Sequence, residues 1–210
     1  MGVQPFPMVL QLETHRARLS ARARQALLVA IIAAGALTLT PAAIARRRQP
    51  ACAGATTSVR RGPARLIRRA VVCLLNDARA NHGLPRLHAS GALGRSAQRW
   101  TNAMVADGSL SHGSDVGARV SAAGFNWSNV GEIIGAGFGT PRQIVKAWMR
   151  SPTHCDVILD PTFADVGTGV VDHSVAGYAR RGATWTADFA LPRGHRAPSG
   201  NWGPANGCPY

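Results

Sequence analysis

The sequence predicts an α+β domain in which helices come first and an antiparallel sheet follows. In several segments up to Met149, apolar side chains recur at three- and four-residue spacing, which is typical of amphipathic helices. After Pro161 the pattern changes to the alternation of strands. This order indicates a layered α+β fold, and a chain of 210 residues with 46% hydrophobic residues is large enough to form one core.

Two long helices are expected first. Pro63 can open a helix whose apolar stripe continues to about Asn81, where Gly83 and Pro85 follow. Ser90 is a good N-cap for a second helix, and Asp107-Gly108 ends it.

Shorter elements follow in the middle of the chain. Asp115 is expected to cap a short helix that stops at Gly124. Residues 125–134 predict a mixture of loop and strand, and Gly135 to Gly139 a glycine-rich loop. That loop lacks the Gly-Lys-Ser/Thr ending of a phosphate loop, so nucleotide binding there is excluded.

The last third of the chain combines two helix starts with strands. Thr140-Pro141 begins a helix, and Ser151-Pro152 begins a short helical turn. Strands are expected over 164–171 and 183–191, with a neighbouring strand and turn at 178–182. Residues 192–210 are rich in Pro, Gly and Asn and predict an irregular tail.

Residues 1–45 have the features of a signal peptide. Four arginines between residues 16 and 24 precede an apolar run from Ala26 to Leu37, and residues 41–45 end in the small-x-small pattern of a signal peptidase site. Counted on to Thr40, the apolar run is about 15 residues long, short of the roughly 20 that span a membrane. Secretion is therefore expected, with an uncleaved N-terminal membrane anchor as the alternative.

The chain is strongly basic, with 24 Lys+Arg against 10 Asp+Glu. This charge indicates either an anionic partner or arginines spread over solvated faces. Residues 46–62 have no periodicity and predict a basic linker, and Arg46 to Arg69, with eight arginines and no acid, predicts a mobile arm for an anionic envelope. Nucleic acid is not an expected partner, because export and disulfides argue against it and no stacking aromatic residues accompany the arginines.

All four cysteines lie beyond the predicted signal. An even number of cysteines in an exported chain indicates two disulfides. Three connectivities are compatible with the positions, which are Cys52, Cys73, Cys155 and Cys208.

His112, Glu132 and His154 are the candidate site. Each lies in a short segment flanked by turn or helix-stop residues, and Glu132 is the only glutamate after Glu13. Two imidazoles and a carboxylate can hold a divalent metal ion or transfer protons. Each residue alone is also compatible with an ordinary role, as a turn residue or a strand end, and their spacing is too long for a local ligand motif.

Several pieces between Val72 and about Leu191 resemble, in order and spacing, a bacterial domain of the CAP superfamily (cysteine-rich secretory proteins, antigen 5 and pathogenesis-related proteins), also called SCP-like extracellular proteins. The pieces are 74–84, Ser111-His112, Arg119 through Gly124-Phe125, Gly131-Glu132, 147–154, 158–161 and 166–169.

The resemblance implies a CAP domain over 63–191, an α-β-α sandwich with a central antiparallel sheet between helical layers. It also implies a cleft in which His112, Glu132 and His154 meet, resembling the divalent-metal site of several members. Members of the superfamily are secreted, and many bind sterols, lipids or other partners. A Cys at the position of Cys73 is often accompanied in relatives by an upstream Cys like Cys52, which implies the pairs Cys52–Cys73 and Cys155–Cys208.

The chain departs from the superfamily pattern around the cleft. Ile133 stands where bacterial members usually have Asn, and Cys155 and Val157 replace the usual Arg and Asn. Arg150 and Ser151 occupy the neighbourhood of a second Glu known from eukaryotic relatives. Losing such polar supports typically weakens a metal site by roughly 10–100-fold.

These observations predict a secreted, non-enzymatic CAP-domain protein that binds a small apolar ligand such as a lipid or sterol, a cell-envelope component or a protein partner. No cofactor is required, although the cleft could hold a divalent cation such as zinc weakly. The alternative is a metal-dependent, peptidase-like hydrolase that uses His112, Glu132 and His154.

Overall fold

Three long strands and one short strand form the central sheet of the domain. The computed structural model describes residues 52–175, 182–197 and 208. The strand order is β1-β3-β4-β2, with β2 (Trp127–Phe138) antiparallel to β4 (Ala183–Pro192) and β4 antiparallel to β3 (Asp165–Val171). The two-residue strand β1 (His88–Ala89) runs parallel to β3. The three long strands form the central antiparallel sheet expected from the sequence, and the short strand β1 adds one parallel pairing at its edge.

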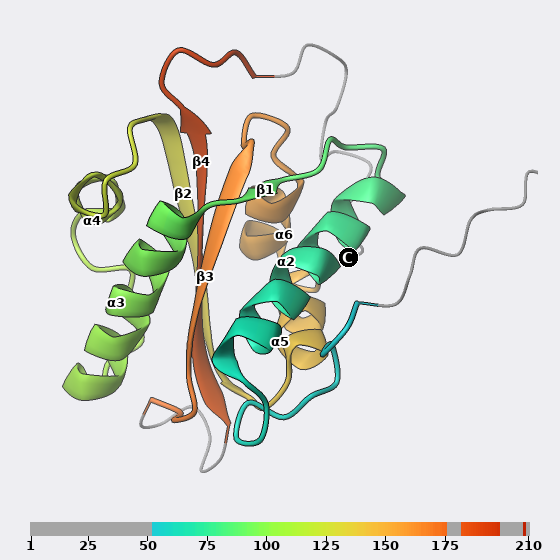
Figure 1. The fold of residues 1–210 in the computed structure, drawn as a ribbon, viewed down its shortest axis with the longest axis vertical. Helices are drawn as coiled ribbons and strands as arrows, with labels where there is room; N and C mark the ends of the chain where they lie inside the picture. The colour runs from blue at the N-terminus through green and yellow to red at the C-terminus, as the bar shows by residue number, and fades with distance from the viewer. Residues whose placement is uncertain (1–51, 176–181, 198–207, 209–210) are drawn as a thin grey trace, which may run out of the picture. The chain divides into compact units, whose positions relative to one another are not determined.

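Helices cover both faces of the sheet, so the layered α+β fold is confirmed. Figure 1 shows α3 (Gly91–Asp107) and α4 (Val116–Ala122) on one side, with α2 (Ala64–Asn81), α5 (Pro141–Trp148) and α6 (Pro152–Leu159) on the other. The largest core cluster lies between the sheet and the second group of helices. Its fully buried aromatic members are Trp148, Trp185 and Phe189.

Most helix ends form as their capping residues predict. The side-chain oxygens of Ser90, Asp115 and Thr140 accept hydrogen bonds from backbone N–H groups in the first turns of α3, α4 and α5. Gly108 ends α3 in the left-handed conformation, at φ 64°. Ser151 precedes α6 but makes no such cap, and α6 is longer than the single turn expected there.

Strand β2 continues through the glycines that predicted a loop. It reaches Phe138 and pairs with β4 as far as Ala183. A Cβ on Gly135 would lie 2.7 Å from Ile144 Cδ1, and Trp148 Nε1 donates to the Ile134 carbonyl over 2.9 Å. The glycine therefore lets α5 pack directly on the strand, and the loop prediction is wrong because it took a packing glycine for a turn residue.

Both predicted disulfides form, Cys52–Cys73 and Cys155–Cys208. Residues 52–62 are a series of turns held by the first disulfide and by a bond from Val59 N–H to the Gly139 carbonyl at 2.9 Å. The prediction of a mobile arm over Arg46 to Arg69 is therefore wrong for residues 52–69.

Some predictions fall outside the described residues. These are the signal peptide over 1–45, most of the strand and turn at 178–182 and most of the tail over 192–210. Within the part that the structure describes, none of the helices combines the length and apolarity that a membrane crossing requires.

Arg79 joins α2 to the segment that connects α6 with β3. Its guanidinium is fully buried and donates to four carbonyl oxygens, those of Pro85 (2.8 Å), Ile158 (2.9 Å), Asp160 (2.7 Å) and Phe163 (3.4 Å). Burial lowers the pKa of Arg79 to about 10, against an opposing effect of the Asp160 charge, so the side chain stays protonated at neutral pH.

Replacing Arg79 with Met is expected to lower the free energy of unfolding by at least about 3 kcal/mol, because buried carbonyls lose their donors. Chemical denaturation measures this difference. Arg65→Met, at an exposed position of the same helix, should change stability by no more than about 0.5 kcal/mol. Equal effects of the two changes would contradict the role given to Arg79.

Candidate functional site

Glu132 is the buried centre of the candidate site. Its side chain is 1% exposed. Its neighbour Ile133 packs in the core on the α2, α5 and α6 side, so the Glu132 carboxylate points to the face that α3 and α4 cover. Nδ1 of His112 lies 2.8 Å from Oε1, and Nη2 of Arg119 lies 2.7 Å from Oε2. Both carboxylate oxygens therefore have cationic or polar partners within the chain.

The loop between α3 and α4 carries His112, and α4 carries Arg119. Arg119 Nη1 donates to the His112 carbonyl over 3.0 Å, and the Arg119 guanidinium lies 3.9 Å above the Trp100 ring. The indole N–H of Trp100 donates to the Ser111 carbonyl over 2.9 Å. Gly113, at φ 65°, passes against the same ring, where a Cβ would lie 2.7 Å from it. One arginine and one tryptophan thus fix the turn that carries His112.

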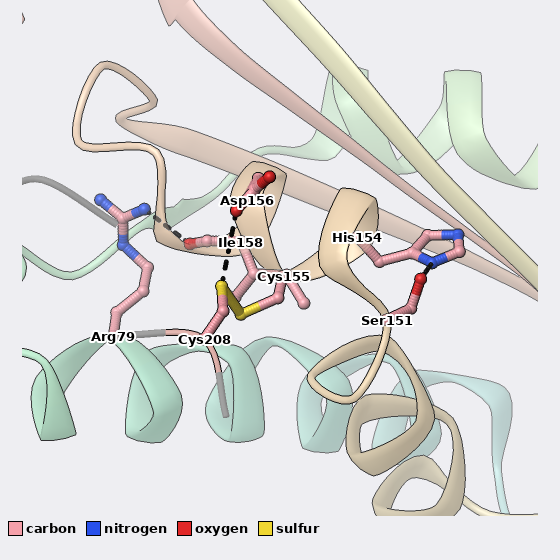
Figure 2. The surroundings of a disulfide bond; sticks show 7 residues. All are labelled: Arg79, Ser151, His154, Cys155, Asp156, Ile158 and Cys208. Atoms are coloured by element: carbon pink, nitrogen blue, oxygen red, sulfur yellow. Dashed lines mark hydrogen bonds between the residues drawn. A yellow bond between two sulfur atoms is a disulfide. The ribbon is translucent and has the colours of Figure 1, made fainter. Parts of the chain in front are cut away.

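His154 lies in the helical layer on the other face of the sheet. It lies on α6, with Nδ1 2.7 Å from Ser151 Oγ. Burial lowers the pKa of His154, and the charge of His112 lowers it further. Figure 2 shows the neighbouring Cys155 pointing away from His154 to its disulfide partner Cys208. Cys155 is therefore not available as a ligand.

The three predicted ligands do not converge as a three-donor metal site. Within the described residues, the only three metal-ligating atoms that lie within 4.8 Å of one another come from Cys52, Cys73 and Asp77, and both sulfurs belong to a disulfide. Glu132 has instead the guanidinium of Arg119 at the distance of a charge-assisted hydrogen bond. An ion at Glu132 would have to compete with that internal cation.

Comparison with protein families matches residues 72–189, more than half of the chain, to CAP, the cysteine-rich secretory protein family. The chain belongs to this family. The resemblance drawn from the sequence is thus confirmed, and the matched segment contains His112, Glu132, His154 and Arg119.

Relatives of this CAP domain occur in bacteria. The chain is 30% identical over 148 residues to the uncharacterized protein YkwD of Bacillus subtilis (strain 168), a match that covers 68% of this chain and 54% of YkwD. The chain therefore spans about half the length of that curated relative.

Two solved structures share the fold. An extracellular protein containing a SCP domain from Bacillus anthracis str. Ames matches with a TM-score of 0.51 and 21% identity, over 59% of this chain and 39% of that one. An outer surface protein from Borrelia burgdorferi matches with a TM-score of 0.52 and 15% identity, over 59% of this chain and 90% of that one. At these identities the matches show the fold alone.

Asp188 is a second acid at the site formed by Glu132, His112 and Arg119, which is called the CAP site below. It lies directly across from Glu132 in the pairing of β2 with β4, is fully buried, and neither carboxyl oxygen has a hydrogen-bond partner. Burial raises the pKa of Asp188 to about 8, Ser96 opposes the rise, and the Glu132 charge adds to it. At neutral pH the pair therefore carries mainly one negative charge, which Arg119 balances.

Sequence reasoning found Glu132 and both histidines but gave Arg119 and Asp188 no role. The signal for Asp188 is an acid within the apolar strand pattern of 183–191. Arg119 has no such local signal, because its spacing from Glu132 becomes a contact only after α4 packs on β2.

Asp188 predicts a pH dependence of stability. Its folded pKa lies above the ordinary value of 3.8, so the folded chain holds this proton more tightly than the unfolded chain, and stability falls as pH rises from about 4 to about 8. The slope from this group approaches about 1.4 kcal/mol per pH unit. Urea denaturation between pH 5 and 8 should show a flatter dependence for Asp188→Asn than for the wild type. Parallel curves would contradict a protonated Asp188.

Proposed function

We propose that this CAP domain acts outside the cytoplasm as a non-enzymatic binding domain. The observation that carries the proposal is the engagement of both Glu132 oxygens by His112 and Arg119. A carboxylate held in this way is a poor general base, since its lone pairs already accept hydrogen bonds from the protein. Its arrangement suits a fixed structural charge that orients the surrounding side chains.

An extracytoplasmic location rests on three observations. The first 45 residues have the pattern of a signal peptide. The chain has two disulfides, which persist in oxidising compartments. The two matched structures are described as an extracellular protein and an outer surface protein.

The ligand classes are a small apolar molecule such as a lipid or sterol, a component of the cell envelope, and a protein partner. A cavity of about 440 Å³ beside the site favours the first class. It lies between α3 and α4, and its lining includes Trp100, Ala103, Ala122 and the Arg119 side chain. Its size is within the range of small-molecule sites, and its walls combine apolar surface with arginine.

A divalent cation such as zinc would meet mainly the Nε2 atoms of His112 and His154, because the Nδ1 atoms are engaged by Glu132 and Ser151. Two imidazoles beside an arginine are a weak zinc site, since structural and catalytic zinc normally has at least three protein ligands. The cation is therefore an incidental ligand in this proposal and takes part in no chemical step.

The role of this cavity as the ligand site can be tested by filling the cavity with a larger side chain. Ala103→Trp introduces a large side chain into the lining, whereas Ala106→Trp makes the same change at an exposed position of α3. Titration with a fluorescent fatty acid and a fluorescent sterol is expected to give a Kd at least fivefold higher for Ala103→Trp and an unchanged Kd for Ala106→Trp.

Two results would count against this function. Equal binding by the two tryptophan variants would show that the cavity is not the ligand site. Cleavage of a peptide library by the wild type in the presence of zinc, abolished in Glu132→Gln, would establish the metal-dependent hydrolase instead.

A further inference from the structure

A second, basic groove lies at the opposite edge of the sheet from Glu132. It has a volume of about 570 Å³ and is bounded by α2, the start of α3, β1 and β3. In the strand order, β1 and β3 form one side of the sheet, and β2, which carries Glu132, forms the other edge. Figure 1 shows β1 crossing from the end of α2 to the start of α3. The groove is therefore separate from the candidate CAP site.

Four arginines surround this groove, and no acidic residue lines it. Arg65, Arg68 and Arg69 come from α2, and Arg95 comes from α3. Asp165, which precedes the lining residue Val166 in β3, is outside the lining and interacts with His88 and His195. Four cations around one space repel each other unless an anion lies between them.

Two of these arginines, Arg65 and Arg69, make no hydrogen bond or ion pair within the described part of the fold, in contrast to Arg68 and Arg95. Arg68 donates to Gln98 over 3.3 Å, and Arg95 donates to the Ala123 carbonyl over 3.1 Å. Arg65 and Arg69 are exposed and have no hydrogen-bond or ion-pair partner within the described residues. Their guanidinium groups are free to bind a ligand.

The rest of the groove is mostly apolar, with Ser90, Gln98 and Thr168 as its polar side chains. Val72 and Ala89 contribute apolar wall, and a Cβ built on Gly94 would meet nothing within 4 Å. Strand β1 pairs with β3 only at Asp165 and Val166, so the β3 edge at Thr168 has no partner strand among the described residues and lies at the groove. The volume falls within the roughly 300–1,000 Å³ of small-molecule sites, which is more than a bare inorganic anion requires.

We propose that this groove binds the phosphate group of a phosphate ester, with Arg65 and Arg69 as the main phosphate ligands and the organic part of the ester on the apolar wall. Guanidinium groups match phosphate oxygens in a bidentate geometry, and a phosphate offers more negative charge and more acceptor oxygens than a carboxylate. The site is independent of the function proposed above, so each can fail alone.

Calorimetry with butyl phosphate at low ionic strength tests the assignment. The wild type is expected to bind with a submillimolar Kd, more tightly than it binds butyrate. Arg65→Gln/Arg69→Gln should weaken binding at least tenfold. Arg86→Gln/Arg142→Gln removes the same charge at exposed positions outside the groove and should stay within twofold of the wild type.

Two further variants distinguish a shaped site in this groove from simple charge attraction and from binding at the CAP site. Gly94→Leu narrows the groove without changing its charge. It should weaken the binding of butyl phosphate more than the binding of inorganic phosphate. His112→Ala should leave butyl phosphate binding unchanged. A loss in the Arg86/Arg142 double variant equal to that in the Arg65/Arg69 variant would overturn the proposal, because it would show attraction by net charge alone. Butyrate binding as tight as butyl phosphate would overturn the choice of phosphate.

Vesicle sedimentation distinguishes the source of the phosphate. Binding to phosphatidylcholine vesicles that contain phosphatidic acid, lost in Arg65→Gln/Arg69→Gln, would identify a phospholipid headgroup. Binding of butyl phosphate without vesicle binding would identify a soluble ester. If neither probe depends on Arg65 and Arg69, the groove is not a phosphate site.

Discussion

A buried carboxylate must be neutralised, because removing it from water costs several kcal/mol that only a close cation or several hydrogen bonds can offset. Glu132 on β2 imposes this requirement on the domain. Arg119 meets it from α4 and His112 from the preceding loop. Trp100 supports both through the arginine stack and the Ser111 hydrogen bond. The charge of Glu132 therefore orients α4 and its preceding loop on the sheet, in addition to the apolar contacts of Val120 with Leu93 and Ala190.

Burial and the charge of Glu132 together keep the proton on Asp188. Two carboxylates facing each other inside a protein cannot both be ionised at moderate pH, so the acid with less solvation and no donor keeps its proton. Glu132 has the donors, and Asp188 has none. The CAP site is thus a single buried negative charge with an internal counterion, which fits a binding domain better than a site with an exposed base.

The sequence predicted the helices well because their signals are local. Ser90, Asp115 and Thr140 cap the helices that their spacing predicts, and Gly108 ends α3. The errors arose where tertiary packing overrides local preference. Strand β2 continues through Gly135 because α5 packs closely on it, and the residues after Cys52 are ordered by a disulfide and by hydrogen bonds to distant backbone.

The site was predictable only in part, for the same reason. His112, Glu132 and His154 were singled out from their local segments and placed in one cleft by the family resemblance, and the contact of His112 with Glu132 supports bringing those two together. The roles of Arg119 and Asp188 depend on β2–β4 register and on the placement of α4, which no short motif encodes. Likewise, Arg68 has a hydrogen-bond partner and Arg65 has none only because α3, which carries Gln98, lies beside α2.

Zinc calorimetry on the wild type and on Arg119→Gln tests most directly whether Arg119 is the counterion that occupies Glu132. Binding to the wild type should be weak, in the high micromolar range or above, and binding to Arg119→Gln at least tenfold tighter, because Glu132 gains a free oxygen. His112→Ala in the Arg119→Gln background should remove the gain. Tight zinc binding to the wild type that Arg119→Gln leaves unchanged or weakens would contradict the counterion role of Arg119. Glu132 would then be a metal ligand.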